Sequence, residues 1–109
     1  MTTLDWLAPW EPIHDWPLNQ RKQSEAQLSV EAGSNHPLYQ IPVTLVGVRR
    51  DCDDVLFHLN DGTERFAVVH LTWRQSQEPM PWPETQMFAS IDEFATDRMR
   101  MDHDEWTQE

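Results

Sequence analysis

The sequence predicts an α+β fold in which a three- to four-stranded antiparallel β-meander packs with two helices. Two β-patterned runs meet at Asn60-Asp61-Gly62-Thr63, and Asp-Gly is typical of a tight hairpin turn. The second run ends in an almost unbroken apolar segment at residues 66–73. Good helix formers dominate residues 19–32, and Ser90 with Glu93 three positions later matches a capping box. We therefore expect a central sheet, with helices near 19–32 and 91–101.

The alternation of apolar residues places the strands. Strands are expected at residues 41–50, 55–60 and 63–73, with a short fourth strand at 85–88. A two-residue turn at Asp61-Gly62 would set Phe57 opposite Phe66 and His70 opposite the Asp53 end of the partner strand. In that register both faces are largely apolar, so we expect the sheet to be covered on each side by helices or by the N-terminal arm.

The length of 109 residues favours a single domain, residues 1–109, with one core. Residues 1–17 hold Trp6, Trp10 and Trp16 among three prolines, which favour an extended arm over a helix. Rings of this size are costly to leave in water, so the arm packs either on its own domain or on another chain. At the other end, acidic residues interrupt the apolar stripe, and 102–109 is expected to fray.

The charge balance restricts the partners. The chain has 19 acidic and 8 basic residues, a formal net charge of −11. Because nucleic-acid affinity comes largely from Lys and Arg contacts to phosphates, this balance disfavours nucleic-acid binding, and it disfavours anionic membranes in the same way. It favours a basic protein surface as partner, although acidity that serves only solubility is an alternative.

Cofactor and metal motifs are lacking. Cys52 is the only cysteine, so neither an intramolecular disulfide nor a zinc site with several Cys ligands can form. Asp51, Asp53 and Asp54 do not follow the calcium-loop pattern, and the three glycines form no phosphate loop. No apolar run approaches the roughly 20 residues needed to span a bilayer, and the first residues do not resemble a secretion signal. We therefore expect a cytoplasmic protein without cofactor or metal.

Four sequence blocks carry a resemblance to a known group. They are His36-Pro37-Leu38-Tyr39, Asp53-Asp54-Val55-Leu56-Phe57, Val68-Val69-His70-Leu71-Thr72-Trp73 and Trp82-Pro83-Glu84-Thr85. Together they resemble a group of small uncharacterised bacterial proteins, over about residues 36–94, in which Gly is expected where Gln40 stands. The resemblance implies a bacterial origin and a single compact domain, and it implies no activity and no catalytic residue.

The first functional hypothesis is a non-enzymatic, acidic accessory or inhibitor protein that binds another protein. Its candidate anchors are Trp82, Trp10 and Trp6, since Trp is a preferred interface anchor. Trp82 lies between two prolines, in an extended segment that would lose little entropy on binding. The alternative for Trp82 is that it folds back and plugs the core at the sheet edge.

The second hypothesis is a small enzyme or ligand-binding domain that uses His70. A catalytic histidine needs a nucleophile, and the candidates are Cys52 and Thr72, so Cys52, His70 and Asp53 form the enzyme-like cluster. The structural alternative is an Asp–His pair that only ties the strands together. His58 would lie on the opposite face from His70, which excludes a metal site shared by these two residues.

Overall fold

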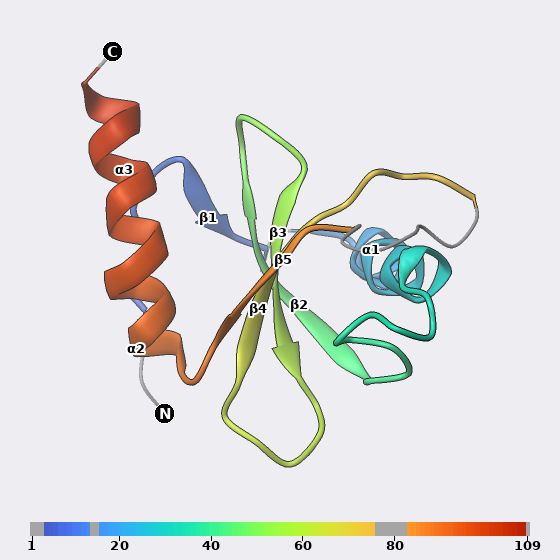
Figure 1. The fold of residues 1–109 in the computed structure, drawn as a ribbon. Coiled ribbons are helices and arrows are strands. Elements are labelled where there is room, and N and C mark those ends of the chain that lie inside the picture. The colour runs from blue at the N-terminus through green and yellow to red at the C-terminus, as the bar shows by residue number, and fades with distance from the viewer. Residues whose placement is uncertain (1–3, 14–15, 76–82, 109) are drawn as a thin grey trace.

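The computed structural model describes residues 4–13, 16–75 and 83–108, which form one antiparallel sheet of five strands with helices on both sides (Figure 1). The strands follow the order of the chain: β1 Trp10–Pro12, β2 Val43–Arg49, β3 Asp54–Leu59, β4 Phe66–His70 and β5 Thr85–Phe88. The helices are α1 Leu18–Glu31, α2 Ile91–Phe94 and α3 Arg100–Thr107, and a π-helical segment, Ala95–Met99, joins the last two. The predicted α+β class is confirmed, and the sheet has five strands where three to four were predicted.

The additional strand comes from the N-terminal arm. β1 pairs with β2, with Trp10 opposite Arg49 and Pro12 opposite Gly47. Proline cannot donate to a ladder and is tolerated on an edge strand, which is where β1 lies. A strand of three residues that ends in proline is too short to show the alternation of apolar and polar residues by which strands are found in a sequence.

The register of β3 and β4 differs from the predicted one by a single residue. Phe57 lies opposite Ala67, and Leu59 donates its backbone N–H to Arg65 O at 3.1 Å. The connection is therefore longer than the two-residue turn expected at Asp61-Gly62, because Asp61 accepts hydrogen bonds from the Thr63 backbone and the Arg65 side chain. A slip of one residue moves every side chain of a strand to the other face. His70 consequently lies opposite Asp54, where Asp53 was predicted.

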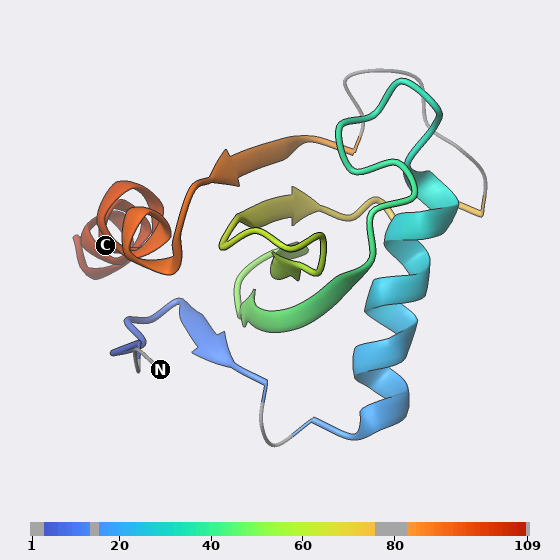
Figure 2. The ribbon, with the colours of Figure 1, turned by 90° about the horizontal axis from the view of Figure 1, so that it is seen from below.

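Each face of the sheet covers its own hydrophobic core, as the sequence predicted. α1 packs on one face, and the C-terminal helix with the N-terminal arm packs on the other (Figure 2). The α1 side is built mainly from buried strand residues: Leu45, Val48, Val55, Phe57, Leu59, Ala67, Val69 and Leu71. The opposite side collects Trp10, Leu56, Val68, Phe88, Phe94 and Met99. Because the two cores lie on opposite faces of the sheet, a functional site could form at the edge of either one.

The C-terminal helix runs further than predicted. Ser90 accepts a hydrogen bond from the Glu93 backbone N–H at 3.2 Å, so the predicted cap is present. α3 continues to Thr107, so the described part of the segment 102–109, which was expected to fray, is helical almost to its end. The reason is that Asp102 is buried and accepts a hydrogen bond from Trp10 Nε1 at 2.7 Å, while His103 Nδ1 lies 2.7 Å from Ala8 O. These two polar side chains contact the N-terminal arm, whereas the sequence analysis expected them in a frayed end of the chain.

None of the helices in the described part of the chain is long and apolar enough to cross a membrane.

Candidate functional site

The tryptophans predicted to contact a partner are mostly used inside the molecule. Trp10 is 1% exposed, and its ring packs edge-on against Phe94 at 5.1 Å between centroids. Trp10, which was predicted to anchor a partner, is therefore part of the core and presents no exposed ring. Trp6 packs against the same core and covers Gly47, where an added Cβ would lie 2.3 Å from the Trp6 ring. Trp82 lies outside the described residues.

The predicted cluster of Cys52, His70 and Asp53 is not assembled. Cys52 and Asp53 line a hollow beside α1, whereas His70 lines another hollow beside β5. His70 is hydrogen-bonded to Asp54, and Thr72, the other candidate nucleophile, donates its hydroxyl to Glu31. Burial raises the pKa of the Cys52 thiol, so less of it is the nucleophilic thiolate at neutral pH. Neither predicted nucleophile is therefore placed to react through His70.

A buried carboxylate organises the segment after β4. Glu31, the last residue of α1, is 0% exposed and accepts four hydrogen bonds. Oε1 accepts from the backbone N–H and the hydroxyl of Thr72, each at 2.9 Å. Oε2 accepts from the Trp73 backbone N–H at 2.9 Å and from Gln27 Nε2 at 2.8 Å. Because Glu31 captures these two backbone N–H groups, β4 ends at His70 and not at Trp73 as predicted.

Trp73 is held by this carboxylate in an unusual conformation. Its φ is +61°, in the left-handed region that bulky residues rarely adopt, and the residue is 45% exposed. Gln27 Nε2 fixes the next residue as well, through a 2.6 Å hydrogen bond to Arg74 O. Strained residues of this kind persist where the surrounding structure over-determines them, and they cluster at functional sites.

The exposed ring of Trp73 lines a hollow of about 500 Å³ between α1 and the β2–β3 turn, which we name the Trp73 hollow. Trp16 lines it from the segment just before α1, and Asp53 lines it from the β2–β3 turn. The two arginines of the lining are already paired, Arg50 with Glu11 at 2.9 Å and Arg49 with Asp51 at 2.8 Å. The hollow therefore combines aromatic surface with little free positive charge.

The Arg49 pair is electrostatically tight. Burial disfavours the charged guanidinium, but the hydrogen bond to Asp51 and the charge of Asp102 outweigh it and raise the pKa of Arg49. The hydrogen bond from Arg49 lowers the pKa of Asp51 in turn. Arg49 thus stays bound to its own carboxylates and is a poor contact for an anionic ligand.

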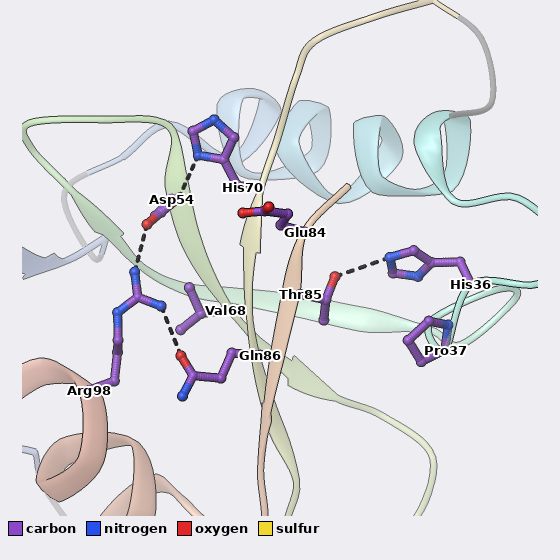
Figure 3. A pocket seen from close by; sticks show the side chains of 9 residues that line it. All are labelled: His36, Pro37, Asp54, Val68, His70, Glu84, Thr85, Gln86 and Arg98. Atoms are coloured by element: carbon purple, nitrogen blue, oxygen red, sulfur yellow. Dashed lines mark hydrogen bonds and ion pairs between the residues drawn. The ribbon is translucent and has the colours of Figure 1, made fainter. Parts of the chain in front are cut away.

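A second hollow, of about 490 Å³, lies on the opposite face of the sheet, and we name it the His70 hollow (Figure 3). His70 Nδ1 lies 2.7 Å from Asp54 Oδ1, and the other oxygen of Asp54 accepts from Arg98 Nη2 at 2.7 Å. Arg98 Nη1 donates to Gln86 Oε1 at 3.0 Å. β3, β4, β5 and the C-terminal helix thus contribute one side chain each to a continuous chain of hydrogen bonds.

His36, in the loop before β2, also lines the His70 hollow but has a structural role. Its Nδ1 accepts from the Leu38 backbone N–H at 3.0 Å, which leaves the proton on Nε2. Nε2 then donates to Pro83 O at 2.9 Å. His36 is buried, so this neutral imidazole joins two loops and has no ring nitrogen left for a ligand.

The carboxylates of the β2–β3 turn do not form a metal site. Asp51 is committed to Arg49, and Asp54 to His70 and Arg98. Across residues 4–13, 16–75 and 83–108, no three His, Cys, Asp or Glu side chains are grouped so as to hold a metal ion.

Sequence reasoning missed Glu31, Arg98 and Gln86 as site residues. Glu31 and Arg98 look like ordinary charged helix residues in the sequence, and Gln86 like a polar residue of a strand. Only Trp73 carried a signal, as a large aromatic residue directly followed by the polar segment Arg74-Gln75.

Neither a protein-family model, nor a curated protein, nor a solved structure matches this chain. The function is therefore argued from the two hollows.

Proposed function

We propose that this protein acts by binding another protein, as an acidic accessory or inhibitor protein, and that the Trp73 hollow is its contact site. The observation that carries the proposal is Trp73 itself, an exposed ring fixed at φ +61° by the buried Glu31. Trp is among the residues that contribute most to interfaces, and an anchor that is already rigid loses little entropy on binding. The strained backbone of an exposed Trp is explained if the ring has to be held in position for a partner.

The chemistry of the surface favours a Lys- or Arg-containing segment as the bound part of the partner. The net charge of −11 attracts basic surfaces and repels nucleic acid. Trp rings bind guanidinium and ammonium groups over their faces, with about 0.5–2 kcal/mol per contact. Trp73 and Trp16 offer such rings, Asp53 offers a carboxylate, and the arginines of the lining are neutralised by Glu11 and Asp51.

The test uses fluorescent twelve-residue peptides, one with alternating Lys/Arg and Gly/Ser and one with Glu in place of the basic residues. We expect the basic peptide to bind, measurably more weakly at 500 mM than at 50 mM NaCl, and the acidic peptide not to bind. Trp73→Ala should weaken binding about tenfold or more, because loss of an interface anchor costs about 1.4 kcal/mol or more.

The matched control is Trp106→Ala, which removes another exposed tryptophan, on α3 and away from the Trp73 hollow. This variant should bind like the wild type. The proposal is wrong if the basic peptide does not bind, or if both Trp variants bind it as well as the wild type. A pull-down from bacterial lysate with the same three proteins then identifies the partner, as a band that Trp73→Ala loses and Trp106→Ala keeps.

A further inference from the structure

β5 is an edge strand whose outer side is unpaired in the described part of the chain. It is the last strand in the order of the sheet, and Figure 2 shows no described helix or strand beyond it. We infer that this edge binds an extended peptide, which adds to the sheet as an antiparallel strand and places a Lys or Arg side chain beside Glu84. The inference goes beyond the proposed binding at the Trp73 hollow, because no residue of β5 lines that hollow.

The first step concerns the direction of the backbone groups of β5. His70 donates its backbone N–H to Glu84 O at 2.9 Å, so the backbone of Glu84 faces β4. Successive residues of an antiparallel strand face opposite edges, so Gln86 also faces β4, and Thr85 and Met87 face outwards. No described residue forms a hydrogen bond with the outward backbone groups of Thr85 or Met87. Two N–H and two C=O groups are therefore available to an added strand.

The two edges of the sheet differ in their protection. An unpaired edge invites another strand, and proteins commonly prevent this with proline, lysine or a covering loop. β1 follows Pro9 and ends in Pro12, so its edge is protected. β5 reads Thr-Gln-Met-Phe and contains neither proline nor lysine. A loop closes the edge only before β5, where His36 Nε2 donates to Pro83 O at 2.9 Å. The open part of the edge therefore begins at Glu84.

The His70 hollow extends along this open edge. Glu84 and Gln86 line it on one side of β5, and Thr85 lines it on the other side, next to His36 (Figure 3). Side chains alternate between the faces of a sheet, so a strand added to β5 directs every second side chain towards the hollow. In this mode of peptide binding the backbone supplies affinity, and pockets for alternate side chains supply specificity.

The charges around the edge favour a basic side chain. Arg98, which lines the hollow, is paired with Asp54 at 2.7 Å and with Asp102 at 2.8 Å. Glu84 is exposed and forms no ion pair within the described residues. The net charge of −11 attracts a basic peptide and repels a second copy of the same chain. A basic peptide is therefore favoured over the pairing of two β5 edges.

The register determines which residues of the peptide pair with β5. With a Lys opposite Glu84, an antiparallel peptide places the residue before the Lys opposite Thr85, and the residue three before it opposite Met87. These two peptide residues exchange backbone hydrogen bonds with β5. The residue two before the Lys lies opposite Gln86, and its own N–H points to solvent. The Lys is the last paired residue of the peptide, because the edge is closed next to Glu84.

The test uses a blocked eight-residue peptide of Thr and Val with a single Lys at its seventh position, titrated into the wild type and followed by NMR. At saturation it should slow the hydrogen exchange of the backbone N–H groups of Thr85 and Met87, whereas that of Gln86 should be slow with and without peptide. N-methylation of the peptide one or three residues before the Lys should weaken binding about tenfold or more, because a hydrogen bond is lost. N-methylation two residues before the Lys is the matched control and should leave the affinity unchanged.

Two protein variants test the charge and the location of the site. Glu84→Lys should weaken binding of the Lys peptide about fivefold or more and should favour a second peptide with Glu in place of Lys. Glu64→Lys is the matched control, since Glu64 is also exposed but precedes β4, whose other end lies beside Glu84, and it should bind like the wild type. Trp73→Ala should also bind the Lys peptide like the wild type, so a failure at the Trp73 hollow is distinguishable from a failure at β5.

Three results would overturn the inference. The first is that the Lys peptide does not bind, and the second is that N-methylation at paired and unpaired positions has the same effect. The third is that the free wild type sediments as a dimer in which the N–H groups of Thr85 and Met87 are already protected, which would assign the edge to a second copy of the chain. We expect a monomer in which both N–H groups exchange rapidly until the peptide is added.

Discussion

Replacing Glu31 by Gln tests whether the buried carboxylate holds the segment that presents Trp73. Each oxygen of Glu31 accepts two hydrogen bonds, one of them from a backbone N–H of Thr72 or Trp73. The amide group of Gln can supply only one acceptor, so its NH₂ must face a backbone N–H. Because side chains can rotate and backbone groups cannot, at least one buried donor loses its partner and a second contact is weakened.

The magnitude follows from these lost contacts. A buried donor without a partner costs about 1–3 kcal/mol, so Glu31→Gln should lower the free energy of unfolding by about 2–4 kcal/mol. This is a large part of the 5–15 kcal/mol or so that stabilises a typical domain. For a chain of this size it corresponds to a Tm lower by about 10–20 °C. The loosened Trp73 should also bind the basic peptide more weakly.

Urea denaturation followed by far-ultraviolet circular dichroism measures the change. Glu64→Gln is the control, since Glu64 is exposed and this variant should stay within about 0.5 kcal/mol of the wild type. If Glu31→Gln were as stable as Glu64→Gln, the four hydrogen bonds would not have the role assigned to them. If Glu31→Gln is less stable but binds the basic peptide with wild-type affinity, the stabilising role of Glu31 stands. The claim that Glu31 holds Trp73 in its binding position is then refuted.

Three further predictions concern other parts of the fold. Gly47→Ala places a Cβ 2.3 Å from the Trp6 ring and should lower the free energy of unfolding by about 1–3 kcal/mol. When Trp6 is also replaced by Ala, the same substitution should cost almost nothing. Equal costs with and without Trp6 would contradict the contact. Gln40 has a φ of +59°, a left-handed conformation that glycine adopts without strain. Gln40→Gly should therefore stabilise the protein by about 0.5–1 kcal/mol, after the greater entropy of glycine in the unfolded chain is subtracted. A lower urea midpoint for this variant would show that the backbone of Gln40 is not strained. Hydrogen bonds from Thr63 and Arg65 lower the pKa of Asp61 from 3.8 to about 2, so the stabilisation from the ionised carboxylate should be present above about pH 4 and lost as the pH falls towards 2. An NMR titration should find this value and a higher pKa in Thr63→Val, whereas an ordinary pKa in the wild type would rule out these hydrogen bonds in solution.

Hydrophobic periodicity and capping chemistry determine much of the fold from local sequence. The alternation around Phe57 and Val68 requires strands, because only a pleated chain buries such residues on two faces. Ser90 and Glu93 start a helix wherever the sheet places them, since the cap bond joins residues three apart. The α+β class, the covered sheet and most element positions therefore follow from the residues in order.

The tertiary structure alone decides which distant polar groups meet. The one-residue difference in the β3–β4 register depends on hydrogen bonds of Asp61 inside a loop, and it determines that His70 meets Asp54 and not Asp53. Glu31 and Trp73 are 42 residues apart, and their contact requires α1 to be packed on the sheet. A hydrogen bond constrains position to within a few tenths of an ångström, whereas a hydrophobic pattern constrains only which face is buried. The sequence therefore specifies where the apolar layers lie, and only the packed chain specifies the polar contacts that form its two hollows.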